Sequence, residues 1–176
     1  MLNILQGEGV TGAELSTHPD VAKISFTGSV PTGAKIMKAA ADTIKHVTLE
    51  LGGKSPLIIF DDADLKNAVK GALMANFFTQ GQVCSNAARV FVQRGIYSEF
   101  LKAFVEQAEK MKIGDPFNED TTVGATICKE HAEKVLGYVQ SAIDEGAKVE
   151  CGGKRVILEG NIFIDENFLI IDQFYP

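Results

Sequence analysis

Residues 21–37, VAKISFTGSVPTGAKIM, have the pattern of a strand that turns directly into a helix. β-branched and aromatic residues predict a strand over 21–26, which the turn-forming Thr27-Gly28-Ser29 ends. Ser29 is a favoured N-cap, and Pro31 fits the first turn of a helix that apolar spacing extends to about residue 44. The stretch therefore predicts one strand–helix unit of an α/β fold.

The same alternation continues along the chain. Helices are expected from Asp62 or Asp64 to Phe77, from Ser98 to about Met111, and from about Lys129 to Glu145. Further strands are expected at 46–51, 56–60, 89–93 and 148–151. Strands separated by helices of this length predict an α/β fold with parallel strand pairing.

Composition narrows the classes of function. The apolar and charged fractions, 45% and 23%, are those of a soluble globular protein, and the net charge of −6 argues against nucleic acid and anionic membranes as partners. Neither a secretory signal nor a membrane-spanning segment is apparent. The three cysteines are far apart and form no CxxC pair, which argues against disulfides and metal sites and favours the cytoplasm.

Cys84 stands in an unusual setting, TQGQVCSN (79–86). Interior cysteines usually have apolar neighbours, whereas the residues before Cys84 are typical of a turn. It is either a cysteine that happens to lie near a loop or a thiol presented for chemistry.

Two other motifs also allow two interpretations. FTGSVPTG (26–33) places a helix N-terminus straight after a strand, which suits a phosphate but is equally explained by a tight turn. In LELGGK (49–54), Glu50 interrupts apolar neighbours, and a carboxylate removed from water there would act as a general base. Strand alternation alone instead predicts that Thr48 and Glu50 face solvent.

FTGSVPTG, LELGGKSP (49–56) and GQVCSN (81–86), in this order, resemble the signature of the aldehyde dehydrogenase superfamily. The separation of Glu50 from Cys84 also agrees with the family spacing between its glutamate and its cysteine nucleophile. The resemblance covers roughly residues 3–154, and TLELGGKSPLIIFDDADL (48–65) looks most like the betaine aldehyde and 4-trimethylaminobutyraldehyde branch.

This resemblance implies roles for particular residues. Cys84 would be the nucleophile that forms a thiohemiacetal and then a thioester, and Glu50 would activate water for hydrolysis to the acid. The Cys84 backbone N–H would be one oxyanion donor, and Gln82 and Asn86 would support the cysteine loop without a catalytic role. The implied cofactor is NAD, with NADP possible, and the residues that would bind it are Gly28, Ser29, Gly33, Leu51 and Gly52.

The resemblance also implies an organisation. Residues 1–51 would be the C-terminal part of a Rossmann-like NAD(P)-binding domain, residues 52–154 the N-terminal part of an α/β catalytic domain, and residues 155–176 an unassigned tail. We expect a small aldehyde, such as an aminoaldehyde, as substrate, and a homo-oligomer for the complete enzyme. Because family members have several hundred residues, the alternative is a non-catalytic remnant or subunit-binding fragment.

Overall fold

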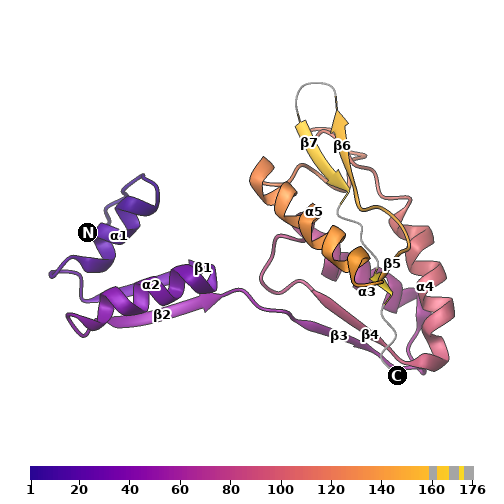
Figure 1. Ribbon diagram of the computed structural model, residues 1–176, viewed down its shortest axis with the longest axis horizontal. Coiled ribbons are helices and arrows are strands. Elements are labelled where there is room, and N and C mark those ends of the chain that lie inside the picture. Colours follow the sequence, from indigo (N-terminus) through magenta and orange to yellow (C-terminus); the bar gives the residue numbers. More distant parts are fainter. Residues whose placement is uncertain (159–161, 167–170, 173–176) are drawn as a thin grey trace. The chain divides into compact units, whose positions relative to one another are not determined.

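The computed structural model describes residues 1–158, 162–166 and 171–172. The chain divides into two compact units, Met1–Gly53 and Lys54–Pro176 (Figure 1). The division follows Gly53, next to the boundary expected at Gly52-Gly53. The assignment of the two units to a cofactor domain and a catalytic domain stays a prediction.

The first unit is built around two parallel strands and a helix. Strands β1 and β2 pair in register from Lys23↔His46 to Gly28↔Leu51. Helix α2 lies along this sheet in Figure 1 and buries one face that includes Ile36 and Ala40. The elements of this unit are α1 (Gly9–Thr17), β1 (Lys23–Gly28), α2 (Val30–Ala41) and β2 (His46–Leu51).

The second unit begins with another parallel pair, β3 and β4, which runs from Pro56↔Arg89 to Ile59↔Val92. One face of this pair packs on α3 and α4 through a cluster of buried residues, namely Ile59, Val69, Ala72, Ile96, Phe100 and Phe104. The elements are β3 (Pro56–Ile59), α3 (Leu65–Phe77), the 3₁₀ turn η1 (Phe78–Gly81), β4 (Arg89–Val92), α4 (Arg94–Ala108) and α5 (Lys129–Asp144).

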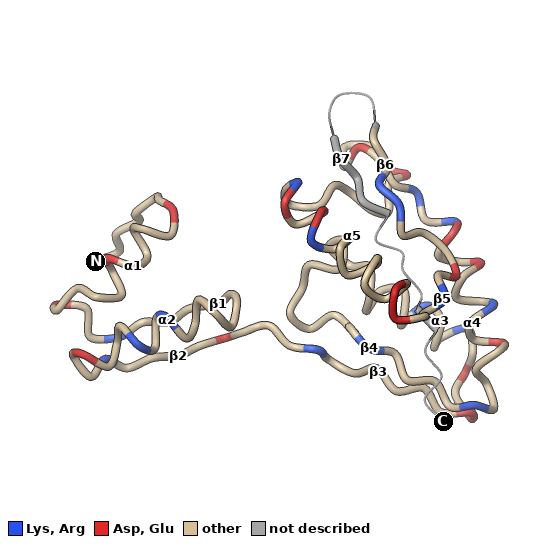
Figure 2. Tube along the Cα trace, in the orientation of Figure 1, with Lys and Arg blue, Asp and Glu red and all other residues tan. Residues whose placement is uncertain are grey.

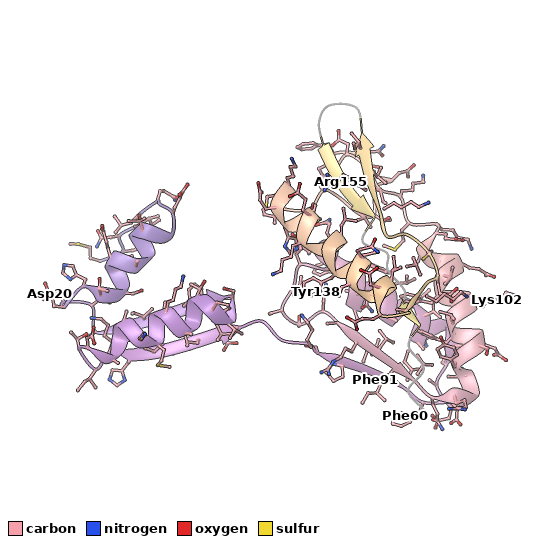
Figure 3. The ribbon with its side chains drawn as sticks, in the orientation of Figure 1. Asp20, Phe60, Phe91, Lys102, Tyr138 and Arg155 are labelled. Carbon is pink, nitrogen blue, oxygen red and sulfur yellow. The ribbon has the colours of Figure 1, made fainter. Side chains whose placement is uncertain are left out.

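The opposite face of the β3–β4 pair is apolar and uncovered within the described residues. Figure 3 shows Phe60 and Phe91 on the side of these strands away from the helices. Phe60 and its neighbour on the same face, Ile58, are 62% and 58% exposed, and Phe91 is 47% exposed. Arg89 lies over the Phe91 ring, 5.9 Å from its centroid, and covers part of this surface.

Strands near the end of the described chain pair antiparallel. Strand β5 (Lys148–Val149) pairs with β8 (Ile171–Asp172), and β6 (Lys154–Leu158) forms a hairpin with β7 (Ile162–Glu166). The parallel pairing expected from the α/β alternation therefore holds for β1–β2 and β3–β4 but not for these strands. The segment 155–176, which was left unassigned, contains β7, β8 and all but the first residue of β6.

The start of one helix differs from the sequence expectation. Helix α4 begins at Arg94 rather than Ser98, so that Ile96 joins the buried face. The chain enters this helix through Gln93, whose side-chain amide exchanges two 2.9 Å hydrogen bonds with Asp61. These contacts join residues 32 positions apart and leave no local signal in the sequence.

Phe104→Ala is expected to destabilise the second unit by about 3–5 kcal/mol, because it empties the centre of the buried cluster. The Phe104 ring lies 5.5 Å from the Phe100 ring and 6.0 Å from that of Phe77, centroid to centroid. All three tyrosines lie in residues 54–176, so tyrosine fluorescence during urea unfolding reports on this unit alone. The control is Phe117→Ala, since Phe117 is 96% exposed. Equal effects of the two substitutions would contradict the packing described here.

Candidate active site

Cys84 is one of the two central residues of a turn between α3 and β4. A hydrogen bond of 3.1 Å from the Asn86 N–H to the Val83 carbonyl closes the turn. Cys84 and Ser85 are exposed, whereas Gln82 and Asn86 on either side are half-buried. Among the residues that the structure describes, neither the thiol nor the backbone N–H of Cys84 has a hydrogen-bond partner. Both groups are therefore available to a ligand.

The chain reaches this turn through three successive residues in the left-handed region. Thr79, Gln80 and Gly81 have φ values of 51°, 53° and 71°. Such angles cost a non-glycine residue on the order of 1–3 kcal/mol and persist only where the surroundings impose them. The sequence showed only Gly81 as a turn residue, because threonine and glutamine carry no signal for this conformation.

Side-chain amides on both sides of Cys84 bind backbone groups, as expected for supports of the cysteine loop (residues 78–88). The Asn86 amide donates to the carbonyls of Asn76 (3.3 Å) and Phe78 (3.1 Å). The Gln82 carbonyl oxygen accepts a 3.3 Å hydrogen bond from the Ile127 N–H. The loop is thereby fixed to the end of α3 on one side and to the segment before α5 on the other.

The other two cysteines have different surroundings. Cys128 is the N-cap residue of α5. The Glu130 carboxyl accepts hydrogen bonds from the Glu130 backbone N–H and from the Cys128 thiol, and both lower its pKa. Cys151 is half-buried and packs near Ala108 and Val123. In contrast to both, the stretch 71–88 around Cys84 has no charged residue (Figure 2).

Glu50 lies on β2, where burial alternates along the strand. Val47, Leu49 and Leu51 are half-buried, whereas Thr48 and Glu50 are exposed. The strand thus shows the alternation that the second interpretation predicted, with Thr48 and Glu50 facing solvent. Glu50 belongs to the first unit and Cys84 to the second, and the structure describes each unit by itself.

The proposed cofactor residues gather where β1 and β2 end beside the start of α2. Ser29 is the N-cap of α2, and its hydroxyl accepts a 3.3 Å hydrogen bond from the Thr32 N–H. Gly28 precedes it and pairs with Leu51 across the two strands. A helix N-terminus directly after a strand, opened by glycine and serine, fits the phosphates of a dinucleotide.

Gly33 has a packing role in the same region. A Cβ atom at Gly33 would lie 2.8 Å from a methyl group of Leu51, closer than real Cβ contacts come. The absence of a side chain therefore lets α2 approach β2, as one glycine of a dinucleotide-binding turn does. Leu51 packs against α2 through this contact. Gly52 follows β2, and a side chain there would meet open space.

The described residues contain no group of three or more His, Cys, Asp or Glu side chains suited to a metal ion. Nor is any helix within this described part long and apolar enough to cross a membrane.

Known proteins resemble this chain in sequence and in fold. The human 4-trimethylaminobutyraldehyde dehydrogenase is 56% identical over 175 residues, which are 99% of this chain and 34% of that protein. A crystal structure of Staphylococcus aureus betaine aldehyde dehydrogenase in complex with NAD⁺ matches with a TM-score of 0.85 and 42% identity, over 88% of this chain and 31% of that one. A structure described as an E. coli NADP dependent enzyme matches with a TM-score of 0.83 and 42% identity, over 90% and 33%.

These matches extend further along the chain than the resemblance expected over roughly residues 3–154. The chain spans about a third of the length of the relatives it matches. The family model for the "Aldehyde dehydrogenase family" matches residues 1–165, and the alignment with the human relative extends over 175 residues. The likeness therefore continues beyond residue 154, where the sequence motifs ended. With a family model that covers most of its length and an α/β fold shared with solved members, the chain belongs to the aldehyde dehydrogenase family.

Proposed function

We propose that this chain carries the nucleophile and the general base of an NAD(P)-dependent aldehyde dehydrogenase. The observation that carries the proposal is the state of Cys84, whose exposed thiol and backbone N–H have no partner within the described residues. A nucleophile must be accessible to the substrate, and an oxyanion donor must not be occupied by another acceptor of the protein.

Each residue would have a defined task. The Cys84 thiolate would add to the aldehyde carbonyl carbon, and the carbonyl oxygen would become the oxyanion of a thiohemiacetal. The Cys84 backbone N–H would donate to this oxyanion. Loss of hydride converts the thiohemiacetal into a thioester, and Glu50 would then remove a proton from the water that hydrolyses it to the carboxylic acid.

NAD, or NADP, would supply the hydride acceptor when bound. Gly28 and Ser29 would hold its pyrophosphate at the start of α2, with Gly33 in the next turn. Leu51 and Gly52 would lie on the nicotinamide side. Relatives described with NAD⁺ and with NADP both match the chain, so the proposal covers both cofactors.

The relatives' names support a substrate class. Because relatives are named for 4-trimethylaminobutyraldehyde and betaine aldehyde, we propose an aminoaldehyde or quaternary ammonium aldehyde as substrate. The complete enzyme would be a cytoplasmic homo-oligomer. The alternative function is that of a non-catalytic fragment that binds subunits.

An NAD-reduction assay on the purified chain, with amino- and alkyl-aldehydes side by side, separates these candidates. The enzyme proposal predicts aldehyde-dependent NADH formation, greater for aminoaldehydes. We expect rates below the usual kcat range of about 1–10³ s⁻¹, because the chain contains only part of the length of active relatives. If no aldehyde supports NADH formation or a covalent adduct, the fragment function is favoured instead.

Cys84 is expected to be the fastest of the three thiols to react with iodoacetamide at neutral pH. Its thiol is exposed and has no partner in the described structure, whereas that of Cys128 donates to Glu130 and Cys151 is half-buried. Mass spectrometry of peptides after brief treatment measures all three rates in one molecule. Faster labelling of Cys128 or Cys151 would contradict the proposed role of Cys84.

A further inference from the structure

The end of α3 is completed by the residues that follow Cys84. The last carbonyls of a helix have no intrahelical donor and need partners from elsewhere. Here the Ala87 N–H donates to the Ala75 carbonyl at 2.8 Å, and the Asn86 side-chain amide donates to the carbonyls of Asn76 and Phe78. The two N–H bonds of one carboxamide suffice for two acceptors. Asn86 therefore acts as a cap supplied from ten residues downstream.

The Asn86 side-chain amide also holds the strained residues of the loop in their left-handed conformation. The Phe78 carbonyl immediately precedes the three left-handed residues, and the Asn86 amide binds it across that run. The Gln82 N–H also donates to the Thr79 carbonyl, at 2.9 Å, and so bridges the last two of these residues. Without the amide, Thr79 and Gln80 would be able to relax toward ordinary φ values.

If Thr79 and Gln80 relaxed, the thiol and the backbone N–H of Cys84 would move. Cys84 lies between the strained residues and Asn86, in the turn that the Asn86 backbone closes. Among the described residues, neither its thiol nor its N–H has a hydrogen-bond partner that would hold it in place. Their positions therefore depend on the two ends of the turn, where Gln82 binds Ile127 and Asn86 binds α3.

We propose that Asn86 is a positioning residue, which sets the Cys84 backbone N–H relative to the Cys84 thiol by tying the strained loop to the end of α3. The proposal rests on the proposed function, in which both groups act on one carbonyl. A nucleophile and an oxyanion donor must match the same tetrahedral centre, and misplacement by about 1 Å costs on the order of 10²-fold in rate.

Two reactions of the same thiol test this role in the 176-residue chain. Acylation of Cys84 by p-nitrophenyl acetate forms an oxyanion and needs the N–H, whereas alkylation by iodoacetamide forms none. Asn86→Leu keeps a similar shape but donates no hydrogen bond, and Asn86→Ala removes the side chain. For both variants we expect the ratio of acylation to alkylation at Cys84 to fall by on the order of 10²-fold. Alkylation itself should change little.

Asn76→Ala is the matched control, because the Asn76 side-chain amide donates within α3, to the Ala72 carbonyl at 2.8 Å, and not to the cysteine loop. It should lower the thermal unfolding midpoint while leaving the ratio unchanged. The proposal is overturned if the ratio of acylation to alkylation is unchanged in the Asn86 variants, or if it falls equally in Asn76→Ala. It is also overturned if the Asn86 variants do not fold. Absence of Cys84 acylation in the unsubstituted chain would instead refute the proposed function.

Discussion

Replacing Cys84 by alanine is expected to eliminate acylation of the chain by p-nitrophenyl acetate. The substitution removes the only thiol whose sulfur and backbone N–H are both free in the described structure. Because covalent catalysis has no second route in this account, the burst of p-nitrophenol should fall to background, a loss of at least about 10³-fold. Stopped-flow absorbance measures the burst.

Cys128→Ala and Cys151→Ala are the matched controls for this loss. Each removes a thiol from the same unit, and both should retain the burst. A burst that persists in Cys84→Ala, or disappears in Cys128→Ala, would place the nucleophile elsewhere.

Glu50→Gln is expected to leave the burst intact and to slow the turnover that follows it. A glutamine of the same shape cannot take a proton from water, so the acyl-enzyme should accumulate. General base catalysis contributes about 10²–10⁴-fold, which sets the expected fall in the deacylation rate. Glu14→Gln is the control, because Glu14 is another exposed carboxylate of the first unit. Loss of the burst itself would mean that Glu50 acts earlier, for example by activating Cys84.

Local signals predicted most helices and strands of the first 150 residues. Strand β2 has the expected bounds, because its alternation of apolar and polar residues continues without interruption. Ser29 and Asp64 cap α2 and α3 as expected, since each side chain needs only an N–H three residues ahead. Gly146 ends α5 with φ of +90°, a value that glycine adopts without strain.

What the sequence did not predict depends on distant contacts. The left-handed run at Thr79 and Gln80 lies in a loop that Asn86 and Gln82 bond to other segments, and the Gln82–Ile127 bond joins residues 45 positions apart. Helix α1 gave no periodic signal, because it buries only Ser16 along its length. Strand β5 was expected, but its antiparallel partner β8 and the β6–β7 hairpin lie at or beyond residue 154, where family motifs were no longer visible.

The candidate site likewise combines features that the sequence predicted with features that only the structure shows. Motifs identified Cys84, Glu50 and the glycine turn, and the structure shows how the cysteine loop is held. The exposure of Glu50 agrees with simple strand alternation and not with a carboxylate buried within its own unit. Its role as a base therefore stays a prediction that rests on the motif LELGGK (49–54) and its spacing from Cys84.

Peptide mapping of the acyl-enzyme tests directly whether Cys84 is the nucleophile. The chain is mixed with p-nitrophenyl acetate, quenched in acid within the burst, digested and analysed by mass spectrometry. We expect an acetyl thioester on the peptide that contains Cys84, in an amount equal to the burst and retained in Glu50→Gln. An adduct on Cys128 or Cys151, or none on Cys84 while p-nitrophenol is released, would contradict it.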